Sequence, residues 1–182
     1  MFRNWLFRDN ATNPAGSSPT ELEPVVAPLT YSWILTGKLA IGPMPRSSLH
    51  WLQLENDGFT RRFSCCYSYE NIFVPVPGHW SSCEISLPDH RSQDELTLSL
   101  LASALTQARL MIVDSSKPLY LHCFAGQERS ALMAVGLVCL LENKNLFDSL
   151  SYVRQCHKSA KPIYTHLDLL DQLLATGVEK YY

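Results

Sequence analysis

This sequence has no large excess of charge of either sign and no internal repeat. It also has no hydrophobic run of membrane-spanning length. The formal net charge is −2, which gives no indication of a general affinity for nucleic acid or an anionic membrane. The longest apolar stretch, residues 131–141, is about half as long as a membrane-spanning helix. A hydrophobic content of 46% over 182 residues is instead typical of one globular domain with a sizeable core. We therefore expect neither a nucleic-acid partner nor a membrane partner.

The six cysteines follow neither a zinc-binding nor a secretory pattern. Cys65 and Cys66 are adjacent, so they cannot form the C-x2-C pair of a zinc site, and the other spacings match no template either. No signal peptide is visible, because residues 1–5 are followed by charge rather than by a long apolar core. The sequence therefore predicts free thiols in a reducing cytoplasm, without a bound metal.

Hydrophobic patterning predicts an irregular N-terminal arm, residues 1–30, followed by a single domain, residues 31–182. In that domain strands alternate with helices, which predicts an α/β fold of three layers with a central, mostly parallel sheet flanked by helices. Local signals place the expected elements: strands over 33–41, 62–67, 83–87 and 119–121, and helices beginning near Ser47 or Ser48, at the capping box Ser92-x-x-Glu95, near Ala131, near Asn145 and near Thr165.

The segment His122–Ser130 (HCFAGQERS) carries the strongest functional pattern. A strand that delivers a tight loop onto a helix N-terminus presents unpaired N–H groups and the positive end of the helix dipole, which favours a bound anion. Arg129 adds a planar fork for two oxygens, and it favours the thiolate form of Cys123. Gly126 is expected to supply the positive φ of the turn. A thiolate beneath a bound phosphate can attack phosphorus and form a phosphocysteine.

This loop resembles the Cys-x5-Arg-Ser/Thr signature of the cysteine-dependent protein-tyrosine phosphatase superfamily, and the compact dual-specificity branch fits best. The resemblance covers roughly residues 31–175. It implies hydrolysis without metal or other cofactor, with Cys123 as the nucleophile and Ser130 stabilising the departing sulfur, although Ser130 is also an ordinary helix-start residue. It implies that His122 supports the loop, and that the phosphate is bound by Phe124, Ala125, Gly126, Gln127, Glu128 and Arg129.

A phosphate ester is cleaved faster when an acid protonates the leaving oxygen. In the family that the loop resembles, this acid is an Asp some thirty residues upstream, after a strand. Asp89 lies 34 residues before Cys123, directly after the strand expected over 83–87. Asp94 is the alternative, but its place inside the expected capping box favours a role at the helix start. Histidines outside the loop follow no pattern, and we expect them at the surface.

The leading hypothesis for the substrate is a phosphoprotein, dephosphorylated on tyrosine and also on serine or threonine. Glu128 departs from the small residue that many relatives carry before the arginine. A carboxylate there disfavours polyphosphorylated substrates, and with no basic residue at Phe124 or Gln127 this counts against an inositol lipid. The alternatives are the same chemistry on a phosphometabolite, an RNA 5′ phosphate or a glucan, and a phosphate-binding pseudophosphatase scaffold.

Overall fold

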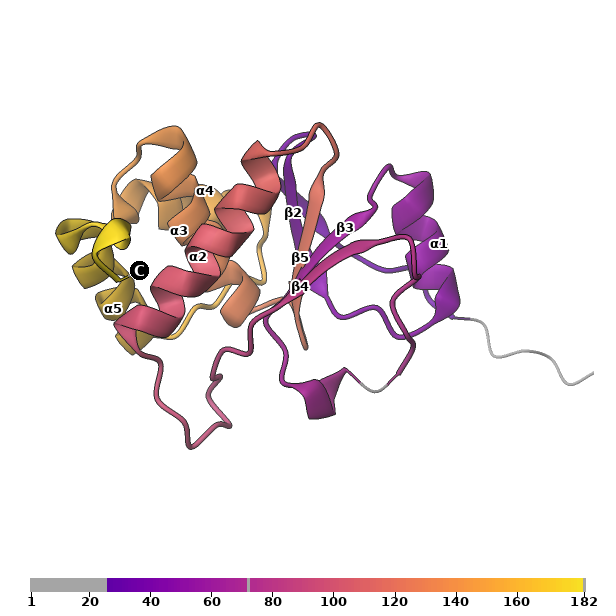
Figure 1. The fold of residues 1–182 in the computed structure, drawn as a ribbon, viewed down its shortest axis with the longest axis horizontal. Coiled ribbons are helices and arrows are strands. Elements are labelled where there is room, and N and C mark those ends of the chain that lie inside the picture. Colours follow the sequence, from indigo (N-terminus) through magenta and orange to yellow (C-terminus); the bar gives the residue numbers. More distant parts are fainter. Residues whose placement is uncertain (1–25, 72, 182) are drawn as a thin grey trace, which may run out of the picture.

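A five-stranded sheet lies at the centre of the fold, in the strand order β1-β2-β5-β3-β4 (Figure 1). The strands β2 (Leu39–Pro43), β5 (Leu119–Cys123), β3 (Arg61–Ser64) and β4 (Ser81–Glu84) run parallel, and β1 (Ser32–Leu35) is antiparallel to β2. The middle strand is β5, and all five of its residues are buried. The predicted α/β class with a mostly parallel sheet is therefore confirmed.

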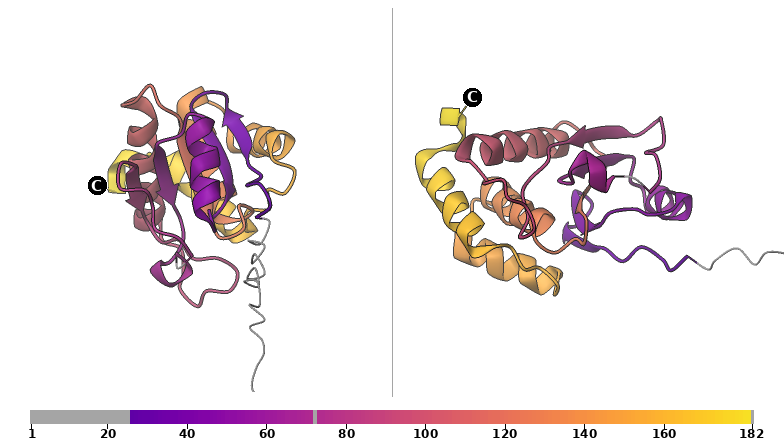
Figure 2. Two further views of the ribbon diagram at one scale, coloured as in Figure 1. Left: turned by 90° about the vertical axis from the view of Figure 1, so that its right-hand side faces the viewer. Right: turned by 90° about the horizontal axis from the view of Figure 1, so that it is seen from below.

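Helices cover the two faces of this sheet unequally (Figures 1 and 2). One face carries α1 (Ser48–Asn56), which buries Trp51 and Leu54 in a cluster with Phe59 and Tyr120. This smaller core is largely aromatic. Phe59 and Tyr120 meet edge to face at a centroid distance of 5.9 Å, and Trp33 stacks on Phe59 at 4.9 Å.

The opposite face carries four helices, which are α2 (Leu98–Val113), α3 (Arg129–Glu142), α4 (Leu146–Cys156) and α5 (Tyr164–Thr176). They enclose the larger core, and α3 lies at its centre with every residue from 129 to 139 buried. The apolar run of the sequence is thus the core helix of a three-layer fold, and it begins where the candidate phosphate-binding loop ends.

Local capping signals located two helix starts correctly and failed at a third. The side chains of Ser47 and Asn145 cap α1 and α4 by accepting hydrogen bonds from backbone N–H groups. The capping box predicted at Ser92 does not form, because the Ser92 hydroxyl accepts from the backbone N–H of Asp94, two residues on, within a turn. The helix α2 begins later, after the N-cap residue Thr97.

Further boundaries differ from the prediction, among them the end of the strand expected over 62–67, which is β3 and ends at Ser64. The strand expected over 83–87 is β4, which spans Ser81–Glu84, although the backbone N–H groups of Ile85 and Leu87 still donate to the carbonyls of Ser64 and Cys65 beyond its end. The last helix begins at Tyr164, because the carbonyl of Ile163 accepts the backbone N–H groups that start the helix, and Thr165 already lies inside it.

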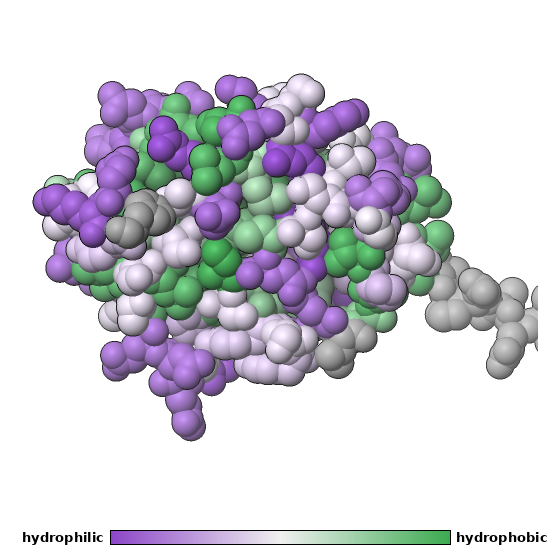
Figure 3. Space-filling model, in the orientation of Figure 1, coloured by the Kyte–Doolittle hydropathy of each residue, from purple (hydrophilic) through white to green (hydrophobic). Residues whose placement is uncertain are grey.

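The structure is a computed structural model, and it describes residues 26–71 and 73–181. The predicted arm lies outside these ranges except for residues 26–30, of which Leu29 is buried and bonds both backbone groups to the Gln53 amide. Within the described ranges no single helix is long and apolar enough to cross a membrane, and α3 and α4 meet that criterion only as a pair bent by 120°. On the face shown in Figure 3, hydrophobic residues are scattered among hydrophilic ones.

Candidate active site

The central strand β5 delivers its last residue, Cys123, to the carboxyl edge of the parallel sheet, where open α/β sheets place ligands. The following loop turns at Gly126, whose φ is +74°, as predicted. A Cβ atom at this position would stand 2.5 Å from the carbonyl carbon of Gly42 in β2, so the close approach of loop and strand requires glycine. The loop then enters α3 at Arg129.

This loop forms a cradle that lacks internal acceptors. Among the described residues, none accepts a hydrogen bond from the backbone N–H groups of residues 124–128. The side chain of Arg129 is only 2% exposed, and its buried Nε has no partner in the part of the chain that the structure describes. The Cys123 thiol lies 3.3 Å from the Ser130 hydroxyl. A buried guanidinium and free N–H groups around a thiol form a site suited to an oxyanion.

A carboxylate from a distant segment holds the Arg129 guanidinium. Glu70, at the end of the 3-10 helix Ser68–Glu70, accepts from Nη1 and Nη2 at 2.6 and 2.9 Å. The residues are 59 positions apart and Glu70 belongs to no motif, so this contact has no signal in the sequence. Burial works to lower the pKa of Arg129, but the bonds to Glu70 and the proximity of Cys123 raise it above its ordinary value. The guanidinium is therefore charged and fixed in orientation.

The predicted acid Asp89 lies in the same cavity as Cys123, a space of about 150 Å³. Its Oδ2 is 2.6 Å from Nη2 of Arg91 and 3.1 Å from Nη2 of Arg129. Burial raises the pKa of the Asp89 carboxyl, but the bonds from Arg91 and the charge of Arg129 outweigh it and lower the pKa. Asp94 is exposed, accepts a 2.8 Å bond from the Tyr67 hydroxyl and does not line this cavity.

Glu128 pairs with the segment that carries the candidate acid. Its Oε1 lies 2.7 Å from Nδ1 of His90, the residue after Asp89. Asp89, His90 and Glu128 each place one ligand atom within 4.8 Å of the others, a spacing that a metal ion would accept. In this structure the Asp89 carboxylate is already paired with Arg91 and Arg129. We therefore interpret the His90–Glu128 contact as a link between the acid-bearing loop and the phosphate-binding loop.

His122 lies beneath the loop, fully buried. Its ring stacks on Tyr120 with centroids 5.8 Å apart, and its Nε2 is 3.3 Å from Nη1 of Arg62. Burial lowers the pKa of His122 to about 3, and the charge of Arg62 acts in the same direction. The imidazole is therefore neutral at physiological pH, which fits a structural support rather than a proton carrier.

Two histidines that were expected at the surface are buried, and this prediction was wrong. His157, after α4, places Nε2 2.9 Å from the carbonyl oxygen of Gly126 and so holds the turn of the loop. His50 bonds its Nε2 to the carbonyl of Ala27 at 2.9 Å. Neither contact has a local sequence signal, because each joins segments more than 20 residues apart.

Phe124 forms part of the cavity wall, and two guanidinium groups lie close to its ring. The Cζ atoms of Arg46 and Arg91 are 4.9 and 5.2 Å from the ring centroid. The ring therefore lies in a cationic surrounding at the opening of the cavity.

Neither a family model nor a curated protein sequence matches this chain. Solved structures do. PTPMT1 in complex with PI(5)P is 16% identical, with a TM-score of 0.68 over 83% of this chain and 96% of that one. The human tyrosine phosphatase-like serine/threonine/tyrosine-interacting protein is 17% identical, with a TM-score of 0.69 over 80% and 96%. Tk-PTP in its active form is 19% identical, with a TM-score of 0.65 over 79% and 95%.

These similarities show that the chain has the fold of the compact dual-specificity phosphatases of the cysteine-dependent protein-tyrosine phosphatase superfamily. The fold that the Cys123–Arg129 loop predicted is therefore confirmed. This fold is shared by a protein named phosphatase-like, so the chemistry has to be argued from the residues of the site.

Proposed function

We propose that the protein is a phosphate monoester hydrolase that works through a phosphocysteine. The observation that carries this proposal is one cavity lined by Cys123, Arg129 and Asp89. The substrate phosphate binds to Arg129 and the free N–H groups of the loop, and the Cys123 thiolate attacks phosphorus. The ester P–O bond breaks as the S–P bond forms, and the Asp89 carboxyl gives its proton to the leaving oxygen.

In the second step, water attacks the phosphocysteine. The Asp89 carboxylate takes a proton from the water, the S–P bond breaks, and the sulfur leaves as a thiolate that accepts a hydrogen bond from Ser130. Bound phosphate is also expected to shift the pKa of the Asp89 carboxyl. It competes with Asp89 for Arg129, and its negative charge disfavours the carboxylate, so substrate binding opposes the interactions that lower the pKa of Asp89.

For the substrate we propose phosphoproteins, with phosphotyrosine and also phosphoserine or phosphothreonine as targets. Side chains 124, 127 and 128 offer no positive charge to a second phosphate, and Glu128 is paired with His90. The rim does hold Arg46 and Arg91, and a protein of this fold is known in complex with PI(5)P, so that lipid belongs in the test. A phosphate-binding scaffold is the second candidate, supported by the likeness to a phosphatase-like protein.

The proposal is tested with p-nitrophenyl phosphate in buffer containing a chelator, between pH 5 and 7.5. Turnover without metal supports the proposed hydrolase. If no turnover is seen across this pH range, the hydrolase proposal is wrong and the phosphate-binding scaffold is favoured. A panel of phosphotyrosine and phosphoserine peptides with PI(5)P then ranks the substrates by kcat/KM. A preference for PI(5)P over every peptide contradicts the proposed substrate class but not the hydrolase.

Asp89→Asn is expected to slow the hydrolysis of phenyl phosphate by about 10²–10⁴-fold, the usual contribution of a general acid. Phenyl phosphate is chosen because its leaving group is a poor one. Esters with acidic phenols need less protonation, so the loss with them is smaller. The fall of kcat/KM on the alkaline side of the pH profile is expected to disappear. Asp94→Asn is the matched control, because Asp94 is exposed and outside the cavity. If Asp94→Asn shows the loss and Asp89→Asn does not, the assignment is reversed.

The His90–Glu128 contact is expected to position the acid-bearing loop. Glu128→Gln and His90→Gln should each lower kcat for phenyl phosphate by about 2–5-fold, in keeping with a partly exposed pair. The double variant should lose no more than either single one, because one interaction is removed in all three. Esters with acidic leaving groups do not need the acid, so a change in their kcat would reflect an altered phosphate-binding loop. We expect their kcat to stay unchanged. Equal losses for both ester classes would show a structural effect and refute positioning of the acid.

A further inference from the structure

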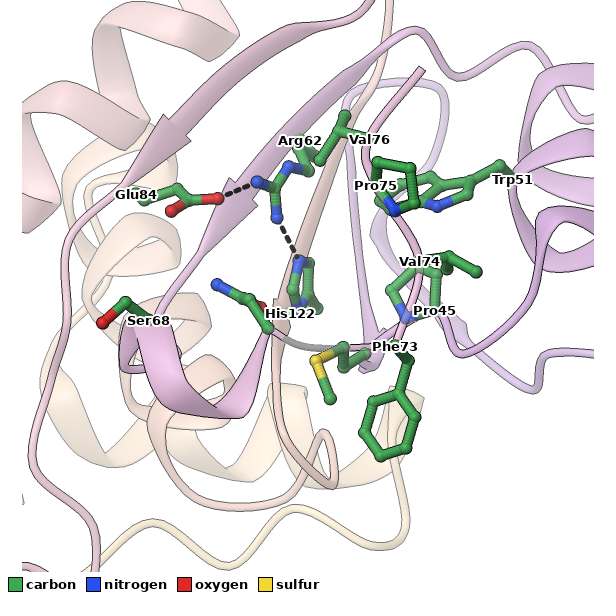
Figure 4. A pocket seen from close by; sticks show the side chains of 12 residues that line it. Pro45, Trp51, Arg62, Ser68, Phe73, Val74, Pro75, Val76, Glu84 and His122 are labelled. Carbon is green, nitrogen blue, oxygen red and sulfur yellow. Dashed lines mark hydrogen bonds and ion pairs between the residues drawn. The ribbon is translucent and has the colours of Figure 1, made fainter.

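A second cavity, of about 260 Å³, lies beside the phosphate-binding loop on the α1 side of the sheet (Figure 4). One wall is polar and carries Arg62 from β3, Glu84 from β4 and His122 from β5. The opposite wall is apolar and consists of segment 73–76 and Trp51 of α1. This cavity shares no lining residue with the one that contains Cys123, so it is a separate site.

Arg62 brings a buried positive charge to this cavity, since the residue is only 4% exposed. Its Nε donates to the Ser82 hydroxyl at 2.8 Å, its Nη1 lies 3.3 Å from Nε2 of His122, and its Nη2 donates to Glu84. A guanidinium has five N–H groups, so Nη1 and Nη2 each keep one for another acceptor. Burial lowers the pKa of Arg62 to about 10, which leaves the group charged at neutral pH.

Trp51 adds a second donor to the same cavity. Its indole Nε1 is buried and finds no hydrogen-bond partner among residues 26–71 and 73–181, although buried polar groups in proteins are nearly always paired. The guanidinium carbon of Arg62 lies 5.9 Å from the centroid of the Trp51 ring, and both side chains line the cavity. Glu84 on the same wall already accepts from Nη2 of Arg62, so a ligand oxyanion would bind to the N–H groups that this ion pair leaves unused, beside the indole.

The apolar wall indicates the chemistry of the rest of the ligand. Val74, Pro75 and Val76 face the polar wall with hydrocarbon, and the Phe73 ring extends this surface (Figure 4). We propose that this cavity binds a small organic acid, with its carboxylate on Arg62 and Trp51 and its hydrocarbon part against segment 73–76. The proposal does not depend on the hydrolase, because its test measures binding.

Benzoate is the probe, titrated into the full ¹⁵N-labelled chain and followed by NMR. The Trp51 indole N–H signal is expected to move downfield, with a dissociation constant on the order of 1 mM, typical of a fragment-sized ligand. Benzylamine and benzyl alcohol, which keep the ring without the acid, are expected to leave it in place. Shifts confined to the N–H signals of residues 124–128 would place benzoate on the phosphate-binding loop and overturn the proposal.

Arg62→Gln is expected to weaken benzoate binding by at least about tenfold, since it removes the charge. Arg61→Gln is the matched control, because the neighbouring arginine donates to the carbonyl of Met111 and does not line the cavity. If Arg62→Gln does not fold, Trp51→Phe decides, since it keeps a ring and removes the N–H. It is expected to weaken binding about fivefold, read from the signals of Val74 and Val76, and unchanged affinity would overturn the proposal.

Discussion

Cys123→Ser is expected to abolish turnover of p-nitrophenyl phosphate, with kcat lowered by at least about 10⁴-fold. In the proposed mechanism the attacking group is a thiolate, whereas a serine hydroxyl at the same place attacks phosphorus poorly. The cradle itself does not depend on sulfur, because Arg129, Glu70 and the loop N–H groups remain. Phosphate binding, measured by calorimetry, should therefore change by less than about threefold while the reaction stops.

Cys139→Ser is the matched control for this experiment. Cys139 is also buried, but it lies in α3 and bonds to Ser149 rather than to the loop. It should keep wild-type turnover apart from a change in stability. If Cys123→Ser retains more than a tenth of the wild-type rate, Cys123 is not the nucleophile and the phosphocysteine mechanism is wrong.

Glu70→Gln is expected to lower the free energy of unfolding by about 3 kcal/mol. The side chains of Glu70 and Arg129 are 4% and 2% exposed, and removing one charge of a buried pair leaves the other uncompensated. The same change frees the guanidinium, so kcat/KM for p-nitrophenyl phosphate should fall by about 10–100-fold. Urea denaturation and steady-state kinetics measure the two effects.

The stability effect has a defined pH dependence. Burial raises the pKa of the Glu70 carboxyl, but bonds from Arg129, the Tyr67 backbone and Arg91 outweigh it, so the folded-state pKa lies below the ordinary value of 4.5. The stabilisation is therefore present above about pH 4.5 and is lost as the pH falls through the folded-state pKa. The difference between wild type and Glu70→Gln should shrink in that range.

Asp94→Asn is the control for Glu70→Gln as well. Its carboxylate is exposed and accepts one bond, from the Tyr67 hydroxyl, so its removal should change stability by less than about 1 kcal/mol. An unchanged unfolding free energy in Glu70→Gln would show that Asp89, 3.1 Å from Arg129, compensates the guanidinium by itself.

The features that could be predicted from the amino-acid sequence are those with local causes. The loop from Cys123 to Arg129 is contiguous, so its chemistry and the positive φ of Gly126 follow from neighbouring residues. The order of strands and helices follows from hydrophobic periodicity, and it predicted a three-layer α/β fold with a mostly parallel sheet. Local signals failed where a polar side chain had two options, as at Ser92, which closes a turn instead of starting a helix.

The distant residues that complete the site are brought there by tertiary packing and could not be predicted. Glu70 reaches Arg129 and His157 reaches Gly126 across 59 and 31 positions, because sheet register and loop paths bring these segments together. The same packing places Asp89 rather than Asp94 beside Cys123, and it buries Arg62 next to Trp51. Such contacts leave no periodic or spacing signal, since each depends on the position of a whole element and not on its own sequence.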